Sequence, residues 1–185
     1  GKIIPYRGSW VEFEYDAKNL LHVRIDRKRK FYGTVFLRAL GMKTDEQILR
    51  TFYRVDKVGI RDKKLFWSVA PGLVGLRLTH PALSRSGEQV VPAGKRITSA
   101  LLKELQKAKI EQIEASINDL EGAFAVADVV DMSTGEVLLE ANQEVTAAAV
   151  SNFVEAGIPG FEVFYPERDE VGNVLSATLK KDPVK

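Results

Sequence analysis

Cysteine is absent from this sequence of 185 residues. Its absence excludes disulfide crosslinks, cysteine-ligated zinc and thiol nucleophiles. Long apolar runs are absent as well, since none approaches the roughly 20 residues that a membrane-spanning helix needs. We therefore expect a protein that does not enter a membrane and that works in the reducing cytoplasm.

Motifs that carry catalysis are also missing. The two histidines, His22 and His80, are far apart and have no companion ligand motif. No glycine-rich phosphate loop and no Gly-x-Ser-x-Gly elbow occurs. Ser84 and Ser86 lie in a polar stretch without a nearby base. We predict no catalytic residues, no metal ligands and no cofactor of the chain's own.

Charge is present but unevenly placed. The net charge is only +2, yet residues 1–53 hold 11 Lys and Arg against 6 Asp and Glu. Residues 54–171 hold 13 against 18, and residues 172–185 hold 3 against 1. A basic first part beside an acidic middle predicts two surfaces with different partners. The basic part is the better candidate for contact with phosphate.

The first segment predicts strands followed by helices. Residues 9–15 alternate between apolar and polar, and residues 20–26 predict a second strand paired with them. The basic run 27–30 is expected to be a solvated turn. Helical spacing runs from Tyr32 to Leu40, with Gly41 at the C′ position. A capping box at Thr44 and Gln47 predicts a second helix, which ends at Phe52 or Tyr53.

Further along, shorter elements are expected. Strands are predicted over 57–60 and 64–69 around an Arg61–Asp62 turn. An apolar strand is predicted over 123–131, and the tail Val174–Leu179 is interpreted as a returning strand.

An internal repeat follows from placing Gly87–Ala115 over Gly135–Val163 without a gap. Apolar residues coincide along both copies, and Thr98 falls on Thr146. Each copy predicts a strand, a turn, a threonine N-cap, a helix and a strand, because a threonine hydroxyl satisfies an N–H of the first helical turn. We expect a pseudo-symmetric module. Its last strand carries Phe161, Phe164 and Tyr165, for which burial is expected and a docking patch is the alternative.

The N-terminal blocks resemble a known family. Residues 3–10 (IIPYRGSW), 23–30 (VRIDRKRK), 37–40 (LRAL) and 44–49 resemble the lobe domain of bacterial RNA polymerase β subunits, and residues 176–183 resemble the return of the chain to that lobe. The middle resembles, more loosely, an insertion of small β/α modules. The N-terminus, which lacks an initiator Met and a signal pattern, favours an excised piece.

The resemblance implies a DNA-facing site at six residues. Trp10 matches a lobe tryptophan that faces the non-template strand, although a tryptophan is by itself more often a core residue. Asp26 matches an acidic residue near the same strand, with a turn-capping role as the alternative. The remaining residues could contact downstream duplex phosphates, or form a solvated hairpin tip: Arg27, Lys28, Arg29 and Lys30.

The sequence thus predicts an α+β fragment in two parts. A partial mixed α/β lobe comprises 1–53 and 172–185, and an inserted module with the strand-turn-helix-strand pseudo-repeat comprises 54–171. The expected partners are DNA, as downstream duplex and non-template strand, other polymerase subunits, and transcription regulators at the insertion. The resemblance implies that Mg²⁺ is bound elsewhere in the parent enzyme. A free-standing regulatory or scaffold protein with a repeated β/α module is the alternative, and an enzyme comes third.

Overall fold

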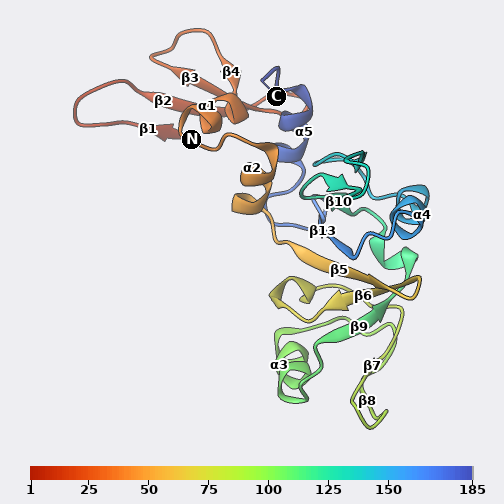
Figure 1. Cartoon of the computed structure of the whole chain (residues 1–185). Helices are drawn as coiled ribbons and strands as arrows, with labels where there is room; N and C mark the ends of the chain where they lie inside the picture. The colour runs from red at the N-terminus through yellow and green to blue at the C-terminus, as the bar shows by residue number, and fades with distance from the viewer. Residues whose placement is uncertain (185) are drawn as a thin grey trace. The chain divides into compact units, whose positions relative to one another are not determined.

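The computed structural model describes residues 1–184. The chain divides into two compact units (Figure 1). Unit 1 combines Gly1–Tyr53 with the residues from Pro166 onward, and unit 2 is Arg54–Tyr165. The fold is α+β, with helices packed on antiparallel sheets.

Unit 1 is built on a four-stranded antiparallel sheet. Its strands follow one another in the order β1 (Lys2–Ile3), β2 (Val11–Tyr15), β3 (Leu21–Ile25) and β4 (Phe31–Tyr32). The predicted pairing of the second and third strands is confirmed, with Phe13 opposite Val23. Because β2 begins at Val11, Trp10 lies just before the strand rather than within it.

Two helices follow the sheet at the predicted places. Helix α1 (Gly33–Ala39) ends before Gly41, whose φ of +113° permits the expected left-handed C′ residue. Helix α2 (Asp45–Phe52) begins with the predicted capping box. The Gln47 N–H donates to the Thr44 hydroxyl, and the Gln47 side-chain oxygen accepts from the Thr44 N–H, at 3.2 Å each.

The tail forms a helix, so the predicted strand over Val174–Leu179 is wrong. Helix α5 (Val174–Lys181) buries Leu175, Ser176, Thr178 and Leu179, a spacing that gives one helical face. The Leu21 N–H donates to the Thr178 hydroxyl at 2.9 Å, which ties α5 to β3. Two sequence segments far apart therefore form one unit.

Arg38, whose side chain is only 9% exposed, also links the two segments of unit 1. Arg38 on α1 donates to the Asp182 carboxylate at 3.0 Å, to the Asp45 carboxylate, and to the Lys43 carbonyl at 2.8 Å. Asp182 is itself buried. The Tyr53 hydroxyl makes a second link between these segments. It donates to the Gly172 carbonyl at 2.7 Å and accepts from the Ser176 N–H at 3.2 Å.

Unit 2 contains a five-stranded antiparallel sheet. The strand order is β10 (Phe124–Ala125), β13 (Gly160–Phe164), β5 (Asp56–Arg61), β6 (Lys64–Ser68) and β9 (Gln112–Ala115). The β5–β6 turn is at Asp62–Lys63, one residue later than predicted, because both residues have positive φ. One face of the sheet forms the core, centred on Val58, Trp67 and Phe161.

Unit 2 contains two similar series of elements, although the second has an additional strand, β10, between η2 and β11. The first series is β7 (Ala82–Leu83), β8 (Gln89–Val91), α3 (Ser99–Lys107) and β9, and a short 3₁₀ turn, η1 (Pro71–Leu73), precedes it. The second is β11 (Val129–Val130), β12 (Val137–Leu139), α4 (Ala147–Glu155) and β13, after the turn η2 (Ile117–Leu120). The Thr98 hydroxyl accepts from Leu101 N–H at 3.2 Å, and the Thr146 hydroxyl accepts from Ala149 N–H at 3.1 Å. Both predicted N-caps are confirmed.

Residues 123–131 do not form the single strand that was predicted. They are divided between β10 and β11, which belong to different sheets. The cause is Asp128, whose carboxylate accepts from the Ala141 N–H at 2.7 Å and so holds the chain between the two short strands. Burial is confirmed for Phe161, Phe164 and Tyr165, so these aromatic residues do not form an exposed docking patch.

Candidate nucleic-acid interface

Trp10 is held at the edge of the unit 1 sheet with part of its ring in solvent. The residue is 37% exposed, whereas Trp67, the other tryptophan, is fully buried in unit 2. Gly8, with a φ of +124°, turns the chain immediately before it. The ring is therefore available for contact in a way that a core tryptophan is not.

Asp26 and Trp10 hold each other by two hydrogen bonds. The Asp26 N–H donates to the Trp10 carbonyl, and the Trp10 N–H donates to the Asp26 carboxylate, both at 2.9 Å. Hydrogen bonds from Ser9 and from the Trp10 backbone, with the charge of Lys28, lower the pKa of Asp26. Asp26 thus caps the turn, and its carboxylate is ionised at neutral pH.

Arg27 completes the cluster. Its guanidinium carbon lies 5.7 Å from the centre of the Trp10 ring, within the range of a cation–π contact. Asp26 and Arg27 both have positive φ, so the backbone turns back toward Trp10. Together the three residues line a hollow of about 260 Å³.

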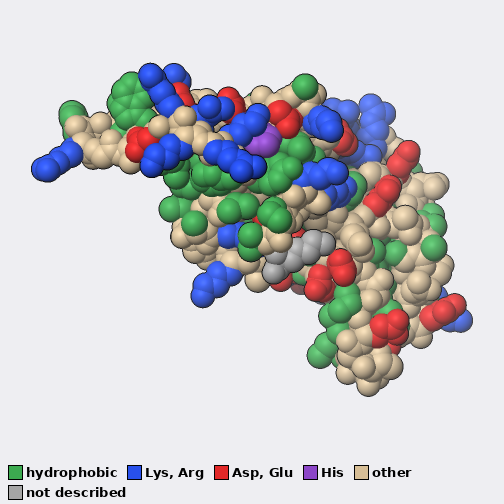
Figure 2. Space-filling view, turned by 90° about the horizontal axis from the view of Figure 1, so that it is seen from above, with side chains coloured by type: hydrophobic (Ala, Val, Ile, Leu, Met, Phe, Trp, Pro, Cys, Tyr) green, Lys and Arg blue, Asp and Glu red, His purple; other side chains and the backbone are tan. Residues whose placement is uncertain are grey.

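The structure therefore brings together three of the six predicted site residues. The other three, Lys28, Arg29 and Lys30, are exposed and follow directly in the chain. Among the described residues they are not part of the hollow's lining. In Figure 2, Lys and Arg side chains lie mainly across the upper part of the view, with some Asp and Glu among them. The result is an aromatic ring with one guanidinium beside it and three exposed cations next in the chain, a combination suited to stacking and phosphate contact.

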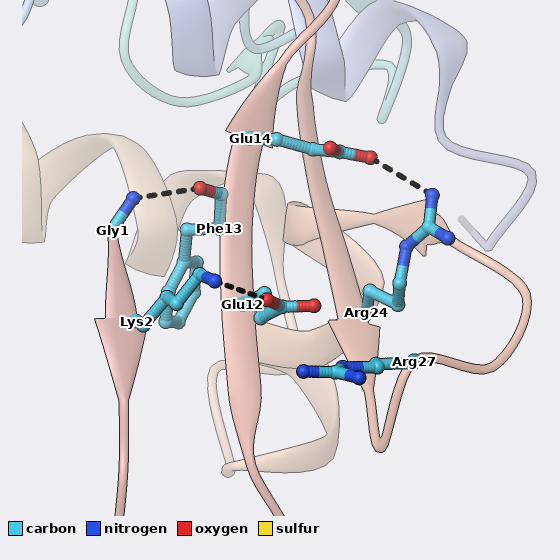
Figure 3. Close-up of a pocket in the computed structure, with 7 residues that line it drawn as sticks. All are labelled: Gly1, Lys2, Glu12, Phe13, Glu14, Arg24 and Arg27. Carbon is cyan, nitrogen blue, oxygen red and sulfur yellow. Dashed lines mark hydrogen bonds and ion pairs between the residues drawn. The ribbon is translucent and has the colours of Figure 1, made fainter.

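A second hollow lies beside the first and was not predicted from the sequence. Figure 3 shows its lining, in which Lys2 pairs with Glu12 at 3.0 Å and Arg24 pairs with Glu14 at 3.3 Å. Arg27 lines both hollows. The pKa of Glu12 is lowered, first by its hydrogen bond with Lys2 and further by nearby cations. Acidic residues at alternate positions of β2, with Lys2 on the neighbouring β1 and Arg24 on the neighbouring β3, were the signal that could have revealed these pairs.

His22 has a structural role in β3. It is buried in β3, stacks on Tyr32 with ring centres 5.1 Å apart, and shares a hydrogen bond of 3.0 Å with the Asp16 carboxylate. Hydrogen bonds from Leu20 and His22 lower the pKa of Asp16 to about 2. Over residues 1–184 no group of three or more metal-ligating side chains occurs, and no helix there is long and apolar enough to cross a membrane.

Comparison with known proteins supports one family. Residues 1–66 match the family model for RNA polymerase Rpb2, domain 2. The chain is 67% identical to the DNA-directed RNA polymerase subunit beta of Solibacter usitatus and 60% identical to that of Koribacter versatilis, in both cases over the whole chain. It is 37% identical to that of Syntrophotalea carbinolica over 98% of the chain.

The chain spans 13% of the length of each of these relatives. Two matches cover the residues of unit 2 as fully as those of unit 1, although the family model itself ends at residue 66. The chain therefore belongs to the family of bacterial DNA-directed RNA polymerase β subunits, as a segment that includes the Rpb2 domain 2 region.

Proposed function

We propose that unit 1 is a DNA-contacting surface of an RNA polymerase that uses Mg²⁺, bound elsewhere, to join nucleotides on a DNA template. The observation that carries this proposal is the hollow at Trp10, where a half-exposed indole lies between a basic turn and a sheet. An unpaired base of the non-template strand stacks on Trp10, a contact worth about 1–3 kcal/mol. The segment contributes binding, and catalysis is performed by other parts of the enzyme.

The basic turn acts on the phosphates next to that base. Arg27 is already beside the ring, and Lys28, Arg29 and Lys30 extend toward solvent from the same turn. Each cation that neutralises a phosphate of the downstream duplex adds about 0.9 to the slope of log affinity against log salt. A titration against salt therefore distinguishes the two contacts, because phosphate contact changes the slope and stacking does not.

The proposal assigns separate roles to the two parts of the chain. Residues 1–53 and 172–185 form the lobe, and residues 54–171 form an insertion built as a pseudo-repeat of 87–115 and 135–163. The two equivalent series of elements, each with its threonine N-cap, support the repeat. The insertion binds transcription regulators, the lobe contacts other polymerase subunits as well as DNA, and the enzyme works in the cytoplasm.

Tryptophan fluorescence of the 185-residue chain tests the stacking. Trp10 is half-exposed and Trp67 is buried, so a single-stranded oligonucleotide should quench only the Trp10 emission. Trp10→Phe should abolish the quenching. Tyr15→Ala removes an exposed aromatic residue from the end of β2, outside the hollow, and should leave it unchanged. Quenching that survives in Trp10→Phe would show that the oligonucleotide binds somewhere other than the hollow.

A further inference from the structure

Two segments of unit 2 pair to form a narrow ribbon that precedes helix α3. Strands β7 and β8 pair at its far end (Figure 1), and Arg77 forms an isolated antiparallel bridge with Arg96 at its base. The Ile97 N–H donates to the Leu76 carbonyl at 2.8 Å beside this bridge. We call residues 76–97 the basic ribbon, because they hold four cations against one carboxylate: Arg77, Arg85, Lys95 and Arg96 against Glu88.

The bridge places two arginine side chains next to each other on one face. Because the hydrogen bond flanks the bridge, Arg77 and Arg96 form a non-hydrogen-bonded pair, the arrangement in which opposite side chains are closest. The Cβ atoms of such a pair are about 4.5–5.5 Å apart. The residues that alternate with the arginines are buried, so both arginines point to solvent: Leu76, Leu78 and Ile97.

Neither arginine is neutralised within the chain. Over residues 1–184, no carboxylate forms an ion pair with Arg77 or Arg96. Like charges directly opposite each other destabilise a strand pair. A second isolated bridge in unit 2 joins Phe124 to Glu144, so a bridge of this kind does not need two cations. The arginine pair therefore points to an anion that binds from outside.

Carboxylates near the basic ribbon do not take the place of that anion. Asp119 is buried, and its carboxylate accepts hydrogen bonds from the Thr79 N–H, the Thr79 hydroxyl and the Ser116 N–H. Glu88 lies beside the turn between β7 and β8, at the opposite end of the basic ribbon from Arg96. The two guanidiniums are thus left for an external partner.

The chemistry of the basic ribbon favours a nucleic-acid backbone over a protein. A guanidinium presents a planar set of donors that matches a phosphate group. Protein interfaces centre on apolar anchors, and within the described residues 76–97 Leu83 is the one exposed large apolar side chain. The surrounding segment, residues 54–109, holds 12 Lys and Arg against 4 Asp and Glu, a balance that attracts a polyanion.

We propose that the basic ribbon of unit 2 binds the phosphate backbone of duplex DNA, with Arg77 and Arg96 donating to neighbouring phosphate oxygens. Lys95, which is exposed beside Arg96, adds a further cation. This surface needs no unpaired base and does not involve Trp10. It therefore goes beyond the proposed function, in which unit 1 contacts DNA and the insertion binds regulators.

NMR titration of the isotope-labelled 185-residue chain with a short DNA duplex tests the proposal. Shifts should move at Arg77 and Arg96, and the affinity is taken from the N–H groups of the basic ribbon, so that binding at unit 1 does not mask it. The double variant Arg77→Gln/Arg96→Gln should weaken this binding about tenfold and lower the salt slope by about 0.9 for each lost phosphate contact.

Two controls separate binding from folding and from net charge. The double variant should be as thermally stable as the unchanged chain without DNA, because it removes a like-charge pair. Lys57→Gln/Lys63→Gln removes the same charge from exposed positions of β5 and its turn, outside the basic ribbon, and should change the affinity by about twofold at most.

Three results would overturn the proposal. Unmoved shifts at Arg77 and Arg96 would show that the duplex does not bind there. Equal weakening by the control variant would show an effect of net charge alone. Equal binding of a glutamate-rich peptide to the basic ribbon would show an acidic protein partner instead. Failure of the unit 1 proposal is distinguishable, since the shifts at Trp10 would then stay unmoved while those of the basic ribbon move.

Discussion

Residues 54–109 and 110–165 of unit 2 each contain a helix with a threonine N-cap, but the two segments carry opposite charge. Residues 54–109 hold 12 Lys and Arg against 4 Asp and Glu, whereas residues 110–165 hold 11 Asp and Glu and no Lys or Arg. Helices α3 and α4 nevertheless begin after equivalent threonine caps and bury equivalent residues, Leu105 and Phe153. Similar caps and buried positions therefore occur in two segments whose charge differs.

The largest effects should come from the shared core. Leu105 and Phe153 are both fully buried at corresponding positions of α3 and α4. Leu105→Ala should lower the free energy of unfolding by about 2–5 kcal/mol and Phe153→Ala by about 3–5 kcal/mol. Urea denaturation measures both. If one of the two were near neutral, the halves would not be packed as equivalents.

Two buried aspartates of unit 2, Asp119 and Asp56, should make opposite contributions to stability at neutral pH. Asp119 accepts hydrogen bonds from Thr79 N–H at 3.0 Å, the Thr79 hydroxyl at 2.6 Å and Ser116 N–H at 3.0 Å. Asp56 is also buried, but among the described residues its Oδ1 has no hydrogen-bond partner. Burial raises the pKa of Asp56 from 3.8 to about 6, against a smaller lowering by Arg54.

This raised pKa gives stability a definite pH dependence. Between pH 3.8 and about 6 the folded chain binds a proton at Asp56 that the unfolded chain has lost, so the contribution of this group falls as the pH rises through that window. Above that window, the ionised Asp56 lowers the free energy of unfolding by about 3 kcal/mol. Asp56→Asn should remove this slope and gain up to that amount at pH 7, measured by urea denaturation at several pH values. Asp119→Asn should destabilise at pH 7, and a loss of stability in Asp56→Asn there would contradict the account.

Removal of a helix cap should lower the free energy of unfolding by less than the core substitutions do, and by similar amounts for the two helices. Thr98→Ala and Thr146→Ala each remove a side-chain acceptor for a first-turn N–H. Each should lower the free energy of unfolding by about 1 kcal/mol. Thr98→Ser and Thr146→Ser keep the hydroxyl and serve as controls. A cost in only one half would show that the caps are not equivalent.

The smallest effects should come from the charges themselves. Lys107 and Glu155 are exposed at corresponding positions in the last turns of α3 and α4. Because a helix C-terminus favours cations, Lys107→Glu should destabilise and Glu155→Lys should stabilise, each by about 0.3–1 kcal/mol. Thermal unfolding at low salt would detect the opposite signs. Shifts of the same sign would mean that neighbouring charges, rather than the helix ends, decide the effect.

The sequence indicated those features that depend on local pattern. The capping box at Thr44 and the two threonine caps were predictable, because a cap needs only residues a few positions apart. Helix α5 was not, since its small polar and branched residues resemble a strand until tertiary packing buries one face. The bonds between Asp26 and Trp10 depend on the register of β2 and β3, which the sequence does not specify.

Photo-crosslinking in a polymerase whose β subunit carries this segment tests the central claim most directly. A photoreactive amino acid replaces Trp10, and in a control enzyme it replaces Tyr15, which is exposed at the end of β2 but outside the hollow. The account predicts crosslinks from position 10 to the non-template strand near the downstream edge of the open bubble, and none from position 15. Crosslinks from both positions alike, or from neither, would contradict a DNA contact at Trp10.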